Sequence, residues 1–426
     1  MIVISMTKLR SIFGFTRKNI AIWGISIGHG IIHWYPSTFY LLLPVIKDEM
    51  DLSYTEMGFL ITFRYIVGTA VNLPSGMLSD LLGRYNLLLA ISLFLVGVPY
   101  LCVGISNSYL ILLFCMAFIG FGTMLWHPAA LSALRDEYPS KRGWAIGWHG
   151  SSANMGDALG FILSGILLTW VSWRQILINS SMVGVAIGLL LWWLLEISGH
   201  KSENGLPEAS THQPHVEKER QSAREYLTGF GRLIVNPNIV LLSLINGIRS
   251  LTQNGLSTFL PSFFMNIINL SPWLSGIYMS IMQVAGIIAA PISGHLSDQY
   301  GRKRVLTAAL FATTLAVFFL ALLNIAWLFV VFLGVLGFFL YSLRPVLLAW
   351  TMETAPKELG GTAVGIQFSF QSALSALSPV LGGWIADGWG LIYTFYFLAA
   401  MLLFSNLLVL FIKEPQREEG ASNNPN

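Results

Sequence analysis

The sequence predicts an all-α membrane protein with twelve transmembrane helices, built as two parallel six-helix repeats with both termini in the cytoplasm. Hydrophobic residues make up 54% of the chain and Asp, Glu, Lys and Arg only 11%, whereas soluble domains carry about 25% charged residues. A soluble core cannot absorb this much apolar surface, so lipid must cover it. Lys and Arg are also distributed unevenly, and sequence features recur at an interval of 218 residues.

Twelve apolar stretches are long enough to cross a bilayer. We expect helices, because a segment in lipid must satisfy its own backbone hydrogen bonds, and the alternating pattern of barrel strands is absent. The predicted spans are residues 20–46, 54–79, 86–105, 109–134, 143–169, 174–195, 237–264, 272–297, 303–323, 327–350, 362–386 and 391–412.

The distribution of basic residues predicts the orientation. With the N-terminus placed inside, the tails, the central linker and the inward loops hold 19 of the 24 Lys and Arg residues, and the outward loops hold only Lys47 and Arg174. This bias is typical of cytoplasmic loops. We therefore predict a multi-pass protein of the cell inner membrane with both ends in the cytoplasm.

One long polar segment divides the chain. We predict an N-terminal six-helix bundle over residues 1–196, a cytoplasmic linker over 197–232 and a C-terminal bundle over 233–426. Cys102 and Cys115 lie in apolar runs without disulfide or metal-ligand spacing. No ATP-binding loop motif is present, and nothing in the charge suggests nucleic acid. We expect a monomer without a cofactor, whose partners are the lipid bilayer, protons and a small solute.

The repeat is most evident in two polar loops. The eight residues that share this loop pattern are Gly76, Asp80, Gly83, Arg84, Gly294, Asp298, Gly301 and Arg302. Equivalent positions are six helices apart, so the halves have the same topology and a central site is expected between them. The loop resembles the signature of the major facilitator superfamily of transporters between helices two and three and between helices eight and nine.

That resemblance implies a gating role. In the family, the network of this loop latches the cytoplasmic side in the outward-open state. Glycine permits the tight turn, and the aspartate pairs with the arginine. The first copy continues with Tyr85 and Asn86, where a basic residue is common. The alternative is a topological turn without a gating role.

The predicted fourth and fifth helices bear on which branch of the superfamily the chain resembles. Met116 stands where the family often has an intramembrane arginine, and Asp157 stands where the helix-five motif of family antiporters has proline. The run Trp126-His127-Pro128, with Asn154 and Gly156, resembles the fosmidomycin-resistance branch of the superfamily.

Embedded charges are the main indication of a solute. Arg64 lies ten residues into its predicted helix, about 15 Å deep at ~1.5 Å per residue, and Arg249 and Arg344 are also embedded. One deeply embedded acid, Asp157, cannot neutralise three cations. Because guanidinium groups suit carboxylates, phosphates and phosphonates, we predict an anionic solute, with Arg64 as the leading candidate. The alternative is that backbone carbonyls or Asp157 pair with structural arginines.

Histidines form a second candidate set. His29 and His33 share one helix face because they are four residues apart, and His127 and His149 lie in the predicted fourth and fifth helices. They titrate near neutral pH, so they are candidates for solute contact or proton relay, with Asp157 and His149 as proton carriers. The alternative is that each of these histidines is a hydrogen-bonded residue of the protein interior without a role in transport. No carboxylate-rich or cysteine-containing set accompanies them, so no metal site is predicted.

The predicted function is secondary active transport of a small anionic organic solute by alternating access, coupled to protons. Efflux of a phosphonate-like drug and uptake of a carboxylate are both open, as is a non-transporting receptor with a transporter fold. No catalytic cluster indicates an enzyme. For Gln253, Gln367 and Gln371, helix packing through hydrogen bonds is the alternative to solute contact. Trp126 is a candidate for the cavity wall, and its alternative is the aromatic belt at the membrane interface.

Overall fold

The computed structural model describes residues 17–138, 140–199, 231–320, 322–323, 326–356 and 359–413. Within these ranges the chain forms twelve α-helices and one short π-helix, without strands, so the predicted all-α fold of twelve long helices is confirmed. The elements are α2 (Arg17–Glu49), α3 (Tyr54–Leu82), α4 (Tyr85–Ile105), α5 (Tyr109–Glu137), α6 (Arg142–Leu167), α7 (Trp173–Gly199), α9 (Pro237–Ser262), η1 (Phe263–Ile267), α10 (Pro272–Tyr300), α11 (Arg302–Leu320), α12 (Ala326–Thr354), α13 (Gly360–Trp389) and α14 (Leu391–Leu410).

Seven of the described helices are apolar enough on their own to cross a membrane. The other five, α2, α3, α6, α9 and α13, carry polar side chains that lower their hydropathy. Such groups are costly against lipid, so they are expected to face protein or a water-filled cavity. Most of the predicted site residues lie on these five helices, whereas His127 on α5 and Arg344 on α12 lie on two of the seven apolar ones.

Local signals at the ends of α3 and α10 repeat across the halves. Ser53 caps α3 through a capping box with Glu56, and Ser271 stands before α10. Gly83 and Gly301 end these helices with φ values of +58° and +96°, which favour glycine. The repeated loop thus ends one helix and redirects the chain into the next.

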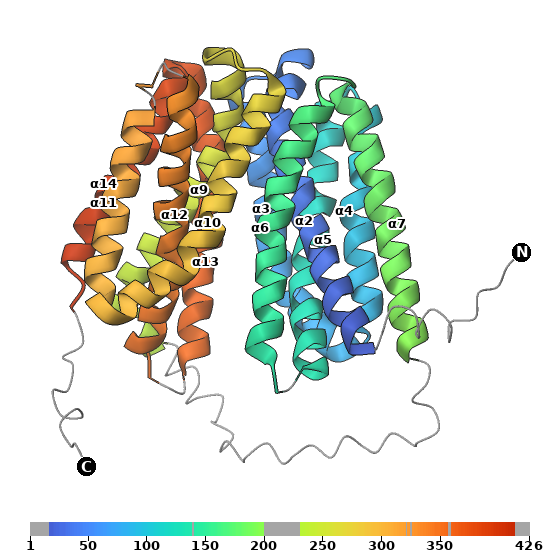
Figure 1. Cartoon of the computed structure of the whole chain (residues 1–426), viewed down its shortest axis with the longest axis horizontal. Coiled ribbons are helices and arrows are strands. Elements are labelled where there is room, and N and C mark those ends of the chain that lie inside the picture. The colour runs from blue at the N-terminus through green and yellow to red at the C-terminus, as the bar shows by residue number, and fades with distance from the viewer. Residues whose placement is uncertain are drawn as a thin grey trace, which may run out of the picture.

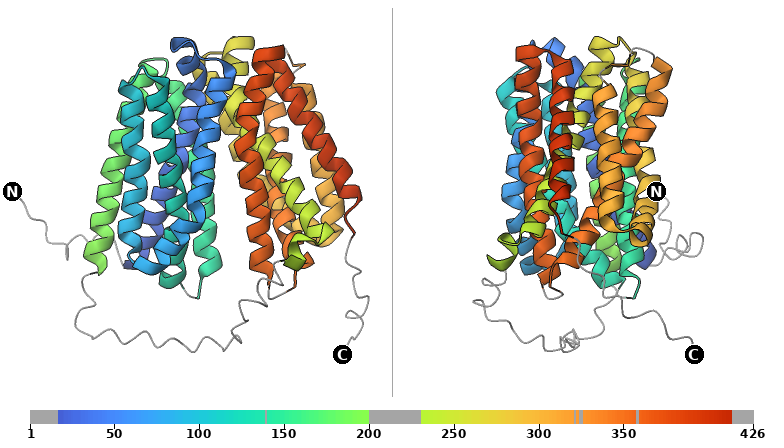
Figure 2. Two further views of the ribbon diagram at one scale, coloured as in Figure 1. Left: turned by 180° about the vertical axis from the view of Figure 1, so that it is seen from behind. Right: turned by 90° about the vertical axis from the view of Figure 1, so that its left-hand side faces the viewer.

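Helices α2–α7 and α9–α14 form two bundles that lie side by side in Figure 1 and in the left view of Figure 2. Between the bundles, α3 packs on α13 and α6 packs on α10. Most of the predicted linker, residues 200–230, lies outside the described ranges, so the division into two bundles at 197–232 stays a prediction. The chain termini also lie outside these ranges, and the orientation in the membrane is likewise still a prediction.

Four glycines allow the bundles to touch at the upper end of Figure 1. A Cβ added at Gly58, Gly383, Gly276 or Gly165 would lie 2.0, 2.2, 2.3 and 2.7 Å, respectively, from a carbonyl oxygen of the other bundle. Gly58 and Gly276 are equivalent in the repeat, as are Gly165 and Gly383. The upper contact is therefore symmetric, with α3 against α13 and α10 against α6.

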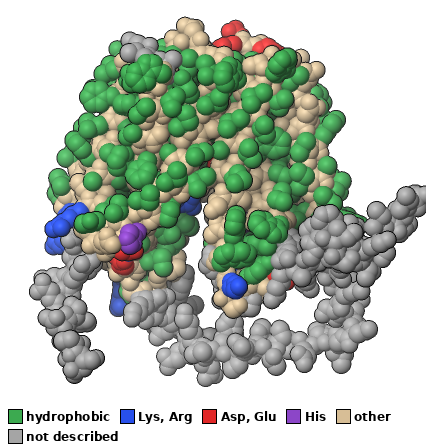
Figure 3. Space-filling view, viewed as in Figure 1, with side chains coloured by type: hydrophobic (Ala, Val, Ile, Leu, Met, Phe, Trp, Pro, Cys, Tyr) green, Lys and Arg blue, Asp and Glu red, His purple; other side chains and the backbone are tan. Residues whose placement is uncertain are grey.

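The opposite end of the same four helices is open. An added Cβ at Gly76, Gly147, Gly294 or Gly365 would have no heavy atom within 4 Å. These glycines are again repeat equivalents in pairs. The space-filling view is hollowed between the bundles at this lower end (Figure 3), so the structure is closed above and open below.

Candidate functional site

Arg64, on α3, joins the two bundles through a chain of hydrogen bonds. Its side chain is buried, and Nη2 donates to the Tyr40 hydroxyl at 3.1 Å. That hydroxyl donates to Oδ1 of Asn254 at 2.7 Å, across the bundle interface. The guanidinium also lies 4.8 Å from the centroid of the Tyr65 ring. Arg64 is thus held by neutral and aromatic groups.

Arg249, on α9, lies in a polar network of the C-terminal bundle. Its guanidinium donates to Asn246 at 3.3 Å, to Gln253 at 2.8 Å and to Ser250 at 2.5 Å. All three acceptors are uncharged. Burial of a cation among neutral acceptors leaves its charge uncompensated.

The network continues away from Arg249 through amides and a phenol. Asn246 donates to Gln371 at 3.1 Å, Gln253 donates to the Tyr341 hydroxyl at 3.3 Å, and that hydroxyl donates to Gln283 at 2.6 Å. Helices α9, α10, α12 and α13 are therefore joined through neutral side chains, which fixes Arg249 without neutralising it.

Arg344, on α12, is exposed, in contrast to the other two arginines. It has neither a hydrogen bond nor an ion pair within the part of the chain that the structure describes. It lies near Arg249 and near His127 of the other bundle, and its positive charge disfavours further positive charge on both. Arg344 is therefore an exposed cation near residues of both bundles, without a carboxylate partner among the described residues.

Asp157, on α6, is engaged with α2 instead of with any arginine. Ser37 donates to its Oδ1 at 2.6 Å, and Nδ1 of His33 lies 3.2 Å from its Oδ2. Both side chains are partly exposed, His33 by 30% and Asp157 by 19%. None of the three embedded arginines is thus paired with a carboxylate among the described residues.

The four candidate histidines converge between α2, α5 and α6. The rings of His29 and His149 are stacked, with centroids 3.6 Å apart and an interplanar angle of 9°. Nδ1 of His29 lies 2.6 Å from the carbonyl oxygen of His149. The ring centroid of His33 lies 4.8 Å from that of His29, and the centroid of His127 lies 5.2 Å from it. The structure therefore brings the predicted set into one cluster.

The remaining candidates are divided between core and network. Trp126 is fully buried, and a Cβ on Gly28 would meet its ring at 2.2 Å, so this side chain packs inside the N-terminal bundle and does not line the hollow in this conformation. Gln253 and Gln371 belong to the Arg249 network. Gln367 is buried, and its Nε2 has no hydrogen-bond partner among the described residues.

The two copies of the predicted gating loop differ in structure. Arg302 contacts Asp298 at 2.5 Å and Glu353, on α12, at 2.7 Å, so the second copy ties helices of its own bundle together. Arg84 is exposed, and the side chain of Asp80 lies outside the described part. Since the lower end is open, neither loop is shown in a latched arrangement, and the gating role stays a prediction.

Sequence reasoning missed Tyr341 and Asp387. Tyr341 precedes Arg344 by three residues and so lies on the same helix face, a signal that could have indicated it. Asp387 accepts hydrogen bonds from the backbone amides of Tyr54 and Thr55, both at 2.8 Å, across the upper interface. Its position just beyond a predicted span gave no sign of a partner in another bundle.

Comparisons with known proteins agree with this architecture. A family model described as Major Facilitator Superfamily matches residues 25–326 and 242–425. The riboflavin transporter RibZ of Clostridioides difficile (strain 630) is 25% identical over 314 residues, which cover 66% of this chain and 68% of the relative. A proline/betaine transporter of Salmonella typhimurium is 24% identical over 392 residues, covering 86% and 77%.

A solved structure shares the fold. It is that of a bacterial homologue of the human lysosomal transporter Spinster in an inward-facing and unoccupied conformation. It superposes with a TM-score of 0.78 at 15% identity, over 93% of this chain and 97% of the other. The resemblance predicted from the repeated loop is confirmed, whereas the finer resemblance to the fosmidomycin-resistance branch stays a prediction. With twelve long helices in two equivalent bundles and a family match along the chain, this protein belongs to the major facilitator superfamily of membrane transporters.

Proposed function

We propose that the chain is a secondary active transporter of a small organic anion, with Arg344 as the primary anion contact. The observation that carries the proposal is the excess of embedded positive charge. Arg64, Arg249 and Arg344 have no carboxylate partner among the described residues, and Asp157 is engaged by His33 and Ser37. A solute carboxylate, phosphate or phosphonate supplies the missing charge, because guanidinium groups bind such groups by paired hydrogen bonds.

The sequence singled out Arg64, but its surroundings favour Arg344. Arg64 already donates to Tyr40 and lies over Tyr65, and it is only 8% exposed. Arg344 is exposed and lies near His127 of the opposite bundle. Arg249 adds positive potential behind Arg344, and its network holds that charge in place. An anion between the bundles would contact Arg344 first.

The glycine contacts support alternating access. The bundles touch above and separate below, and equivalent glycines stand at both ends of α3, α6, α10 and α13. In the predicted orientation the lower end is cytoplasmic, so the structure would be the inward-open state. Rocking the bundles about the central site would close the lower end and open the upper one.

Proton coupling completes the proposal, with Asp157 and His149 as the candidate carriers. The two named relatives carry riboflavin and proline or betaine by name. These solutes differ in chemistry, so membership of the family does not define the solute, and the anion proposal rests on the charges alone. Transport that is insensitive to a pH gradient and to a protonophore would remove the proton from the proposal.

The decisive test is a thermal-shift screen of the purified full-length protein with citrate, inorganic phosphate, methylphosphonate and neutral sugars. A bound ligand stabilises by mass action, about 2.7 kcal/mol at a concentration 100 times its Kd. We expect at least one anion to raise the melting temperature of the wild type and of Arg232→Gln, a control that removes an exposed cation outside the site. Arg344→Gln should lose most of that shift. Stabilisation by neutral compounds alone, or an equal anion shift in Arg344→Gln, would contradict the proposal.

A further inference from the structure

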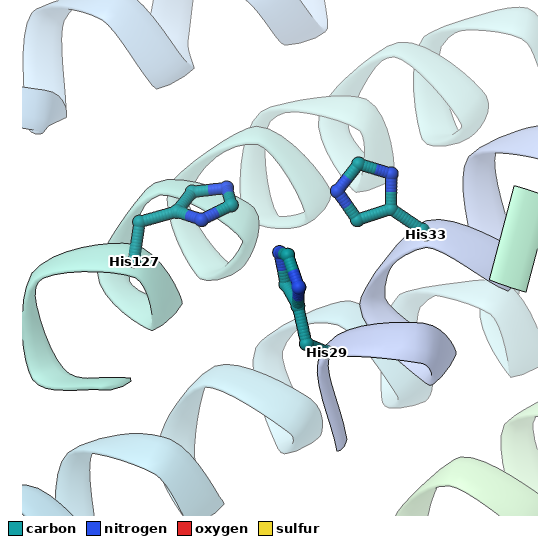
Figure 4. Close-up of side chains that lie close together, drawn as sticks. All are labelled: His29, His33 and His127. Carbon is teal, nitrogen blue, oxygen red and sulfur yellow. The ribbon is translucent and has the colours of Figure 1, made fainter. Parts of the chain in front are cut away.

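Three of the clustered histidines surround a common space. His29 and His33 project from α2 and His127 from α5, and the three side chains point into the same space (Figure 4). One ring nitrogen from each lies within 4.8 Å of the others. Imidazole ligands around a tetrahedral Zn²⁺ have Zn–N distances of about 2.0–2.1 Å, which places the nitrogens roughly 3.4 Å apart. Small side-chain rotations of partly exposed His33 and His127 would close this difference.

Hydrogen bonding prepares two of these rings as ligands. Nδ1 of His29 lies 2.6 Å from the carbonyl oxygen of His149. A carbonyl only accepts, so Nδ1 carries the proton and Nε2 of a neutral ring has a free lone pair. That Nε2 atom is buried and has no partner among the described residues. A buried acceptor without a donor is costly, and a metal ion would satisfy it.

His33 has the same arrangement with a carboxylate. Its Nδ1 lies 3.2 Å from Oδ2 of Asp157. An ionised carboxylate only accepts, so with Asp157 ionised Nδ1 carries the proton and Nε2 of the neutral ring is again free. Metal-binding histidines almost always donate their other N–H to a carboxylate or a backbone carbonyl. His29 and His33 show one example of each. His127 has no hydrogen bond within the described residues, so its tautomer is not fixed and either ring nitrogen can present the lone pair.

We propose that His29, His33 and His127 form a binding site for a divalent transition-metal ion of the Zn²⁺ class. Asp157 and the carbonyl of His149 act as positioning groups. Imidazole nitrogen suits Zn²⁺, Cu²⁺ and Ni²⁺, whereas Mg²⁺ and Ca²⁺ require oxygen ligands. Three histidines leave a fourth position for water or an anionic oxygen. The negative charge of Asp157 favours the ion and the nearby Arg344 opposes it, so an anionic fourth ligand would complete the balance.

The test is Zn²⁺ titration of the purified full-length chain by calorimetry, without solute and without an affinity tag. We expect saturable binding of one Zn²⁺ per chain and none of Mg²⁺. His33→Gln and His127→Gln should each abolish saturable binding, and Asp157→Asn should weaken it by about 10–100-fold, the usual effect of removing a group that orients a ligand. His295→Gln, which changes an exposed histidine on α10, should bind Zn²⁺ like the wild type.

His200, His212 and His215 could bind Zn²⁺ independently, so a variant with all three replaced by Gln is included. Full retention of binding in this variant supports the proposal. The proposal is overturned if the wild type shows no saturable binding, if the linker variant loses it, or if His33→Gln and His127→Gln both retain it. Melting curves without metal identify any variant that fails to fold, and each histidine variant serves as a check on the other. Because no anion is present, this result is independent of the anion proposal.

Discussion

Gly58 of α3 lies so close to Pro379 of α13 that an added Cβ would stand 2.0 Å from the Pro379 carbonyl oxygen. Its repeat equivalent, Gly276, has the same relationship with Phe161 at 2.3 Å. Real Cβ atoms do not approach other atoms this closely, so a methyl group at either position forces the bundles apart. The upper closure therefore depends on positions that contribute no side chain at all.

Gly58→Ala should shift the population away from this closed upper end. Overpacking costs about 1–3 kcal/mol, and that energy corresponds to a change of roughly five- to 150-fold in the ratio of two states. The shift is measurable by pulsed EPR between spin labels at the upper ends of α5 and α14, as a longer distance population. Gly388→Ala is the matched control, because its Cβ would meet nothing within 4 Å near the same end of the molecule. An unchanged distance distribution in Gly58→Ala would contradict the contact.

Gly147→Leu, at the open end of α6, should act in the opposite direction. Nothing lies within 4 Å of its added Cβ, so the conformation described here tolerates the side chain. Gly147 precedes Gly165 by about five helical turns on α6, so it lies on the helix face that α10 contacts at the upper end, and we expect α10 to approach it when the lower end closes. The variant should therefore lose the lower-closed population, seen as a single long distance between labels at the lower ends of α5 and α11. A variant that still closes at the lower end would show that Gly147 does not belong to that interface.

Asp387→Asn should also weaken the upper closure. The carboxylate accepts from the amides of Tyr54 and Thr55 and from the Thr55 hydroxyl, so it caps α3 from the other bundle. The site is exposed, so we expect a loss of only about 1 kcal/mol. The expected outcome is an increase of the upper-open EPR population, smaller than that of Gly58→Ala and reduced further at high salt. An effect that is independent of salt would argue against an electrostatic cap.

Hydropathy, basic residues and the 218-residue interval were sufficient to predict twelve helices in two repeats, because lipid solvation acts on each segment separately. Helical periodicity also placed His29 beside His33, whose ring centroids are 4.8 Å apart. Partners between helices were not predictable in this way. The bond of His33 to Asp157 and that of Tyr40 to Asn254 join residues more than 100 positions apart, and only the packing of the helices determines which faces meet. A metal site was set aside on the sequence because no carboxylate-rich set accompanies the histidines along the chain, and the geometry that supports the proposed site depends on His127 and Asp157 from two other helices.

Tyr40→Phe tests the bond chain that joins Arg64 to the C-terminal bundle. The Tyr40 hydroxyl is buried, accepts from Arg64 and donates to Asn254. Removing it leaves two buried polar groups without this partner, which costs about 1–3 kcal/mol. We expect a lower melting temperature of the purified protein, whereas Tyr393→Phe, which removes an exposed hydroxyl, should leave it unchanged.

A double-mutant cycle with Arg64→Gln then separates this bond from general destabilisation. If the Tyr40 hydroxyl acts through Arg64, the two changes share one interaction, and the double variant should lose less stability than the sum of the single variants. Coupling of about 0.5–3 kcal/mol is expected for residues in one hydrogen-bond network. Strict additivity would mean that Arg64 is held by the Tyr65 ring and its packing alone, and that the link between the bundles does not pass through its guanidinium.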